Sequence, residues 1–400
     1  MGSGRQHIDT AQRRARLGVR HRLASAGTGV GGPLAAADSV LALHATDPAT
    51  VHLSAWARGG GPITSMERAL YQDRQLIRML GMRRTMFVLA TALAPIVYAA
   101  CCHSIAATQR AKLIKDLSSA EVGPDVAGWL ADVERSALAA LHARGQATAA
   151  ELTADEPRLR TRLLMAPGKP YQAAPYVTNR VLLQLAVDGH IVRGEPVGGW
   201  TTNTYRWAPL DAWLPGGLPA LDPATARAEL VRRWLAVFGP APLSDLKWWT
   251  GLGVRELAPA LEAIGAVPVG LDGGETGLVL PTDVDPVPAP APWAALLPGL
   301  DPTPMGWHRR DWYLGEQAAP AVVDRTGNIG PTVWWNGQIV GGWAQRRDGE
   351  IAYRLLVDVG TEAAAAVARA AAALGEWLGP AGVTPGFPAP LDRELAGRER

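Results

Sequence analysis

The sequence has little of what marks secreted, metal-binding or membrane proteins. Its only two cysteines, Cys101 and Cys102, are adjacent, so they cannot form a disulfide framework. Together with His103 they cannot all bind one zinc ion, and no second cluster of cysteine and histidine exists. No apolar run reaches the length of about eighteen residues that a membrane span needs, and the first residues lack the basic-then-apolar pattern of a signal peptide. We therefore expect a cytoplasmic protein with no membrane span, no metal and no cofactor.

Lysine is also scarce, with four residues among the 39 basic side chains. The formal net charge of +2 is close to zero and by itself indicates no particular partner. The positive charge is unevenly placed, because residues 1–30 hold six arginines against one acid, Asp9. Two interpretations of this bias stay open: recognition of phosphate groups by arginine, or the codon usage of a GC-rich genome.

The length of 400 residues exceeds what one ordinary core supports and predicts two to four modules. A hydrophobic content of 48% with 19% charged residues is typical of a folded chain rather than a disordered one. Two joints rich in proline and glycine divide the sequence, Leu214–Pro223 and Pro281–Pro292. We place domains at residues 1–122, 123–215, 222–285 and 293–400.

One pattern of apolar periodicity occurs three times before the second joint. A helix is followed by a short second helix, a third helix and two short strands, which is the order of a winged helix. The expected first helices cover residues 9–24, 125–143 and 224–238, and the second helices begin near Ala35, Thr148 and Leu243. Three unrelated helical hairpins are the alternative interpretation. The segment Gly27–Gly32 has the spacing G-x-G-x-x-G, but no strand precedes it, so we interpret it as a loop.

In the last hundred residues, several short segments alternate in the way that is typical of strands. The expected strands are 332–335, 338–344 and 351–357, joined by turns at Asn336-Gly337 and Asp348-Gly349, and a helix covers 361–378. The sequence as a whole therefore predicts an α+β fold: tandem winged-helix domains followed by a small C-terminal β-rich domain.

His44-Ala45-Thr46 places two polar side chains two residues apart, at the end of what we expect to be an apolar helix. Asp47-Pro48 follows, and then Ser54, Trp56 and Arg58. This combination resembles the AlkZ/YcaQ-type winged-helix DNA glycosylases, the family that includes azinomycin self-resistance enzymes. The matching positions there usually carry Gln-x-Gln or Gln-x-Asp, whereas this chain has His-x-Thr.

Four further motifs extend the resemblance over most of the chain. The segment from Gly239 to Gly251 is similar to the family's third winged helix. Leu296–Pro302, Gly330–Trp334 and Gly337–Trp343 are similar to its C-terminal β domain.

The resemblance implies a monofunctional DNA glycosylase. Its substrate would be the N-glycosidic bond of alkylated or bulky N7-purine adducts in duplex DNA, in repair or in self-resistance to a genotoxic natural product. The implied protein is a nucleoid-associated monomer without cofactor or metal. A non-catalytic winged-helix DNA-binding protein is the alternative on the same scaffold, and a protein-interaction scaffold without affinity for DNA is a third class.

The catalytic candidates are His44, Thr46 and Asp47. A neutral His44 can accept a proton from water, Thr46 can hold the same water, and Asp47 can stabilise the sugar cation or orient His44. The alternative interpretation is a polar residue at a helix C-terminus followed by a plain turn. No lysine lies near the motif, so the sequence gives no support to a Schiff-base lyase step.

DNA contacts are expected on the third helices and on the hairpins of each unit, where cations neutralise phosphates without reading sequence. Ordinary solvated arginines are the alternative interpretation for about half of them. The candidates are Arg83, Arg84, Arg180, Trp200, Arg206, Lys247, Arg346 and Arg347.

Overall fold

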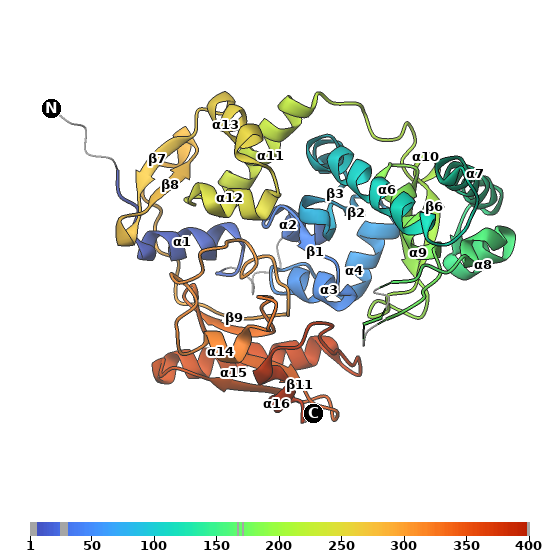
Figure 1. Cartoon of the computed structure of the whole chain (residues 1–400). Helices are drawn as coiled ribbons and strands as arrows, with labels where there is room; N and C mark the ends of the chain where they lie inside the picture. The colour runs from blue at the N-terminus through green and yellow to red at the C-terminus, as the bar shows by residue number, and fades with distance from the viewer. Residues whose placement is uncertain (1–5, 25–30, 166–167, 170–171, 398–400) are drawn as a thin grey trace.

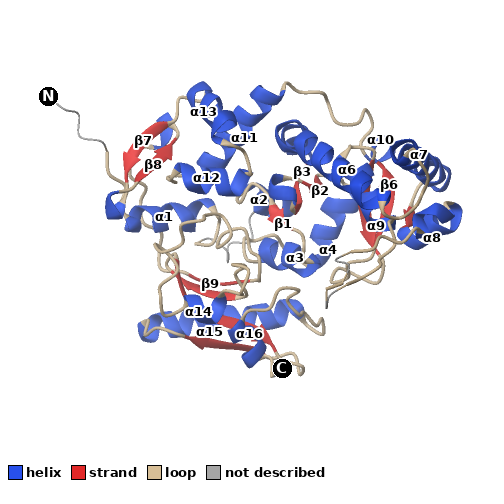
Figure 2. Cartoon of the chain, viewed as in Figure 1, coloured by secondary structure: helices blue, strands red, loops and turns tan. Residues whose placement is uncertain are grey.

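Short antiparallel sheets alternate with helices along the whole chain of the computed structural model (Figures 1 and 2). The structure describes residues 6–24, 31–165, 168–169, 172–397, and the glycine-rich loop expected at Gly27–Gly32 lies largely outside them. Four small sheets are present in the described chain, all of them antiparallel in their strand pairing. The expectation of a mixed α and β fold with small sheets is confirmed.

The first unit, residues 10–90, contains four helices and a three-stranded sheet. Its elements are α1 (Thr10–Arg20), α2 (Gly32–Asp38), β1 (Leu43–His44), α3 (Pro48–Trp56), α4 (Ile63–Glu67), the short π-helix η2 (Arg68–Gln72), β2 (Leu76–Leu80), η3 (Met82–Arg84) and β3 (Met86–Ala90). The sheet order is β1-β3-β2. Asp9 caps α1, because its carboxylate accepts a hydrogen bond from the backbone N–H of Gln12.

The prediction that His44 ends a helix is wrong. Helix α2 ends at Asp38, and Leu41 has a φ of 64°, which a continuing right-handed helix cannot contain. His44 then pairs with Phe87 of β3, so it lies on an edge strand. Pairing with a strand some forty residues away overrides the local helical pattern of 40–44.

A long helical run connects the first unit to the second. It comprises η4 (Thr91–Leu93), α5 (Ala94–Val97), η5 (Tyr98–Cys102) and α6 (His103–Ser118). Within the described residues, Thr91–Ser118 is one helix that by length and composition alone is apolar enough to cross a membrane, and 44% of its apolar window is buried in the protein. Val97 and Cys102 pack in one core and Leu113 and Leu117 in another, a composition that core helices share.

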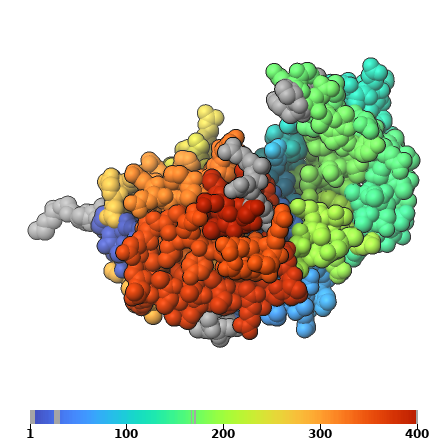
Figure 3. Space-filling model, turned by 90° about the horizontal axis from the view of Figure 1, so that it is seen from below, coloured from blue at the N-terminus to red at the C-terminus, as the bar shows by residue number. Residues whose placement is uncertain are grey.

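The second unit, residues 126–213, has a core of its own. It contains α7 (Val126–Arg144), β4 (Ala147–Thr148), α8 (Ala149–Asp155), η6 (Pro157–Arg160), α9 (Thr178–Val187), β5 (Ile191–Pro196), β6 (Tyr205–Pro209) and α10 (Leu210–Trp213). Thr148 and Glu151 form a capping box that fixes the start of α8, near where the sequence predicts a second helix. Seen from below, this unit (green) forms a lobe beside the C-terminal part (red) in Figure 3.

The third unit, residues 223–279, repeats the order of helices and hairpin. It contains α11 (Pro223–Phe238), α12 (Leu243–Thr250), α13 (Val254–Ala263), β7 (Val267–Gly270), η7 (Asp272–Gly274) and β8 (Thr276–Val279), and η8 (Pro281–Asp283) follows it. Its apolar side chains, such as Trp234 and Trp249, share one large core with those of the first unit.

The C-terminal part, residues 294–395, is a four-stranded sheet with the order β12-β11-β10-β9. Its elements are β9 (Ala294–Leu297), α14 (Ala319–Val322), β10 (Thr332–Trp335), β11 (Gln338–Gln345), β12 (Ile351–Leu355), α15 (Gly360–Leu378) and α16 (Pro390–Leu395). The three strands and the helix expected from the sequence are confirmed. This sheet and α15 enclose a further core that also receives Ala49 and Leu53 of α3.

Candidate active site

The segment from His44 to Asp47 connects β1 to α3, and its backbone is held from two sides. The N–H of Ala45 donates to the carbonyl of Met86 at 2.8 Å. The carbonyl of Ala45 accepts a hydrogen bond of 3.1 Å from Nη1 of Arg78. Both polar groups of the residue between His44 and Thr46 are therefore satisfied, which fixes the course of the backbone through the motif.

His44 is almost enclosed, with 7% of its surface exposed. Its ring lies edge-on to Phe87 with the centroids 5.7 Å apart, and its Nδ1 is buried with no hydrogen-bond partner among the described residues. Burial, reinforced by the charge of Arg83, lowers the pKa of His44 to about 4. The imidazole is therefore neutral at pH 7 and can hold or deprotonate a water but cannot supply a proton.

The other two catalytic candidates have different surroundings. Thr46 is exposed to solvent, whereas Asp47 is buried. Asp47 caps α3: its Oδ1 accepts from the N–H of Ala49 at 3.1 Å, and its Oδ2 accepts from the N–H of Gly386 at 2.7 Å. Burial raises the pKa of Asp47 in spite of these bonds. In this arrangement Asp47 ties the motif to α3 and to the C-terminal segment.

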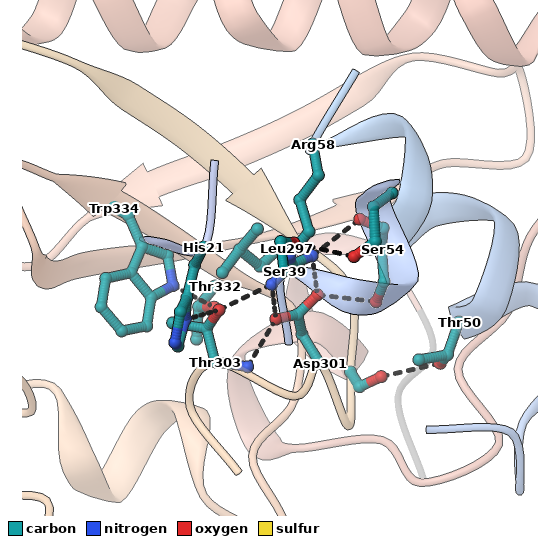
Figure 4. A network of polar contacts seen from close by, with 12 residues as sticks. His21, Ser39, Thr50, Ser54, Arg58, Leu297, Asp301, Thr303, Thr332 and Trp334 are labelled. Atoms are coloured by element: carbon teal, nitrogen blue, oxygen red, sulfur yellow. Dashed lines mark hydrogen bonds and ion pairs between the residues drawn. The ribbon is translucent and has the colours of Figure 1, made fainter. Parts of the chain in front are cut away.

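Arg58, the arginine of the downstream Trp-x-Arg, lies in a fully buried polar network (Figure 4). Its Nη2 donates to Oδ1 of Asp301 at 2.7 Å, and its Nη1 donates to Oδ2 of Asp301 at 2.9 Å. Ser54 donates to the same carboxylate at 2.6 Å, and Thr303 joins Arg58 to His21. This part of the motif therefore fastens α3 to the loop that follows β9.

A second polar cluster lies on the opposite face of the sheet of the first unit. His44 shares a row with Phe87 and Met79, whereas Arg78 shares the next row with Val88. Paired residues project from one face and successive residues from opposite faces, so Arg78 and His44 emerge on different sides. The backbone of the motif thus separates two chemically different environments.

Two residues that our sequence analysis missed belong to this second cluster, Arg78 and His52. The guanidinium of Arg78 lies 4.8 Å from the ring of Tyr205, and Arg78 also interacts with the phenol of Tyr71. His52, on α3, packs on Trp200 at 5.0 Å, and burial beside Arg78 lowers its pKa to about 3. Their only sequence signal is a polar residue inside an apolar helix or strand.

Three predicted DNA contacts come together around α6. Arg83 stacks on Trp248 at 3.9 Å, Arg84 donates to Gln109 at 3.2 Å, and Arg180 pairs with Asp116 at 3.0 Å. Arg84 and Arg180 line a cavity of about 320 Å³ together with Lys112. Arg83 and Arg84 line an adjoining cavity of about 370 Å³. We call these two cavities the α6 groove, and the charged residues of its lining, Arg83, Arg84, Lys112 and Arg180, are all basic.

The other five predicted contacts do not line this groove. Trp200 packs against His52 and Trp377, and Arg206 lies 3.5 Å from Glu151. Lys247 is exposed on α12, and Arg346 and Arg347 are exposed at the turn between β11 and β12. Arg346 forms an ion pair with Glu350 in the same turn.

In the described ranges no three side chains of histidine, cysteine, aspartate or glutamate are grouped as metal ligands. Cys101 and Cys102 are buried free thiols in η5.

Comparison with known proteins identifies the family of the chain. The solved structure of the Streptomyces sahachiroi DNA glycosylase AlkZ superposes with a TM-score of 0.68 at 19% sequence identity, covering 92% of this chain and 97% of that one. Curated protein sequences gave no match. The model of the family "DNA glycosylase AlkZ-like" matches residues 37–377, which include the motif, the first unit from the end of α2 onward, the second and third units and most of the C-terminal part. The chain therefore belongs to the AlkZ-like DNA glycosylase family.

Proposed function

We propose that this protein is a monofunctional DNA glycosylase that hydrolyses the N-glycosidic bond of alkylated or bulky N7-purine adducts in duplex DNA. The observation that carries the proposal is the membership of the AlkZ-like DNA glycosylase family, together with a neutral imidazole, His44, at the position that the sequence resemblance matches to the family's polar-x-polar motif. Its biological role is repair or self-resistance to a genotoxic natural product. We further propose a cytoplasmic, nucleoid-associated monomer.

In this proposal residues 1–122, 123–215 and 222–285 are winged-helix domains, and residues 293–400 are a β domain. The repeated order of helices and antiparallel hairpin supports the assignment. The α6 groove supplies part of the DNA surface, because its arginines and Lys112 can neutralise phosphates. Arg346 and Arg347 extend the basic surface at a separate hairpin.

The chemistry needs little from the protein. An N7-alkylated purine is cationic, so the electron pair of the breaking C1′–N9 bond neutralises it without an added proton. The oxygen of a water forms the new bond to C1′, and the proton of that water passes to neutral His44. In this proposal the hydroxyl of Thr46, an exposed residue, holds the same water, while Asp47 keeps the segment in position through its backbone hydrogen bonds.

A second function has an observation of its own. Nδ1 of His44 is enclosed, and both carboxylate oxygens of Asp47 are occupied by backbone N–H groups. A protein that binds alkylated duplex without cleaving it needs nothing more from these residues. The alternative is therefore a non-catalytic DNA-binding protein on the same scaffold.

Release of free N7-alkylguanine from an alkylated duplex tests the proposal. We expect the wild type to release base, His44→Ala to lose at least tenfold in rate, and His142→Ala, an exposed histidine on α7, to match the wild type. Binding of the alkylated duplex without any release by the wild type would favour the non-catalytic alternative. Equal release by wild type and His44→Ala would show that His44 is not a reacting group. The reacting groups would then be expected on the opposite face of the sheet, which carries His52.

A further inference from the structure

Two arginines at the junction of the first and second units have no carboxylate partner among the described residues. They are Arg78 of β2 and Arg193 of β5, two strands in contact across the junction. Arg78 is 3% exposed, and it hydrogen-bonds the carbonyl of Ala45 and the phenol of Tyr71, both of them neutral groups. Arg193 is half-buried, and its side chain makes no hydrogen bond to any described residue. Buried cations are normally paired, because removing a charge from water is costly.

Aromatic rings of β6 hold the two guanidinium groups close together. Arg78 lies 4.8 Å from the centre of the Tyr205 ring, and Arg193 lies 5.3 Å from the rings of both Tyr205 and Trp207. The register of β5 and β6 shifts between Arg193 and Pro196, and such a bulge re-aims a side chain. Burial lowers the pKa of Arg193, and the positive charge of the nearby Arg78 lowers it further.

Several polar atoms at this junction are buried and unpartnered. They are Nε of Arg78, Nε of Arg193, the hydroxyl of Tyr205 and Nδ1 of His52. Cation–π contacts offset only part of the cost of burying an unpaired arginine. An anion that accepts hydrogen bonds from this group would satisfy the donors and balance the charge.

We propose that Arg78 and Arg193, with Tyr205, form an anion site that binds one phosphate of the DNA backbone beside the motif. The identity of the anion rests on the proposed function, which takes DNA as the substrate. The half-buried Arg193 contacts the phosphate, and the enclosed Arg78 contributes its charge from behind while it holds the carbonyl of Ala45. A phosphate at this point lies on the face of the sheet opposite His44 and is linked to the motif through the hydrogen bond between Arg78 and the carbonyl of Ala45.

The salt dependence of binding to an unmodified duplex tests the site. Each phosphate contact contributes about 0.9 to the slope of log Kobs against log salt concentration. We expect Arg193→Met to lower the slope by about that amount and Arg193→Lys, which keeps the charge, to retain the wild-type slope. Arg232→Met is the matched control, because Arg232 is exposed and already paired with Glu229 at 2.6 Å, and it should leave the slope unchanged.

A wild-type slope in Arg193→Met would overturn the proposal, as would equal losses in the methionine and lysine variants. Arg193→Gln, which removes the charge but keeps a polar side chain, supplies the same measurement if the methionine variant does not fold. The slope is measured on undamaged DNA and is independent of catalysis. Failure of the wild type to release alkylated base would therefore overturn the proposed function while leaving the result on the phosphate site readable.

Discussion

We expect individual histidines to make this protein sensitive to acid. His44 and His52 are buried and neutral, with pKa values lowered to about 4 and about 3, mainly by burial. The unfolded chain binds protons at these residues below pH 6.5, whereas the folded protein does so only near pH 4 or below. The free energy of unfolding therefore falls as the pH is lowered through this range and is fully recovered above about pH 7.

We expect the acid sensitivity to be partly removed by His52→Gln. Between pH 7 and pH 4.5 each buried histidine costs about 2 to 3 kcal/mol of stability, because two pH units correspond to about 2.7 kcal/mol. Urea unfolding at both pH values should show a smaller loss in His52→Gln than in the wild type by about that amount. The exposed His142, replaced by glutamine, serves as the control and should not change the pH dependence. An identical loss in wild type and His52→Gln would contradict the prediction.

Asp47 offers a second test at a single residue. Its carboxylate caps α3 and bonds the N–H of Gly386, so Asp47→Ala should lower the free energy of unfolding by about 1 to 2 kcal/mol. Asp47→Asn keeps an acceptor for the cap and should cost less. If Asp47 positions the motif without touching the sugar, Asn should also retain base release, whereas loss of release in a folded Asp47→Asn protein would assign the charge to the reaction.

The motif could be found in the sequence, but the residues that surround it in the structure could not. Residues 44–47 are recognisable from their letters, since the spacing and the following proline are local. Arg78 reaches the motif only because β2 pairs with β3, and His52 acquires its environment from Trp200, far along the chain. Such contacts depend on which strand faces which, and no local pattern encodes that.

Helix α3 ends two residues before Arg58, and the buried ion pair of Arg58 with Asp301 ties that end of the helix to the loop after β9. Arg58 and Asp301 are both fully buried and make two hydrogen bonds to each other. We expect Arg58→Met to destabilise the protein by about 3 to 5 kcal/mol, because Asp301 would remain as an uncompensated buried charge. Replacing both partners with apolar residues should cost less than that single change, as measured by denaturant unfolding.

An exposed ion pair is the matched control for the buried pair of Arg58 and Asp301. Arg354 and Glu394 form an ion pair of 2.8 Å on the surface, so Arg354→Met should change the unfolding free energy by less than about 1 kcal/mol. Similar effects of Arg58→Met and Arg354→Met would show that the buried network is not what holds α3.

Most elements could be predicted from periodicity and turn residues, and the exceptions have a common cause. The first helices of the three units and the strands of the C-terminal part lie where their apolar spacing places them. The prediction of a helix at residues 40–44 was wrong because a short run of apolar residues fits a helix or a strand equally well. The left-handed backbone conformation of Leu41 interrupts the helix, and the pairing of Leu43 with Val88 stabilises the strand.

At the scale of the whole molecule, the three repeated units are not equivalent. The first and third units share one large core with parts of the C-terminal sheet and with the edge of the second unit that includes α10, whereas the rest of the second unit and α6 enclose a separate core. The sequence predicts three similar units because each repeats the same local order. It does not predict which apolar faces meet, because that depends on contacts between distant segments.

We expect the second unit to open independently of the rest. Leu130 is fully buried in its core, and Leu230 of α11 is fully buried in the large core. Leu130→Ala should lower the hydrogen-exchange protection of α7 to α9 by about 2 to 5 kcal/mol and leave α11 and α13 unchanged, because a cavity destabilises the cooperative unit that contains it. Leu230→Ala, in turn, should leave the hydrogen-exchange protection of α7 and α8 unchanged. Equal loss of protection in all helices with either variant would show that the junction around Tyr205 joins the two cores into one cooperative unit. In that case a phosphate bound at Arg193 would stabilise both cores, and duplex DNA should raise protection in α7 and α11 together.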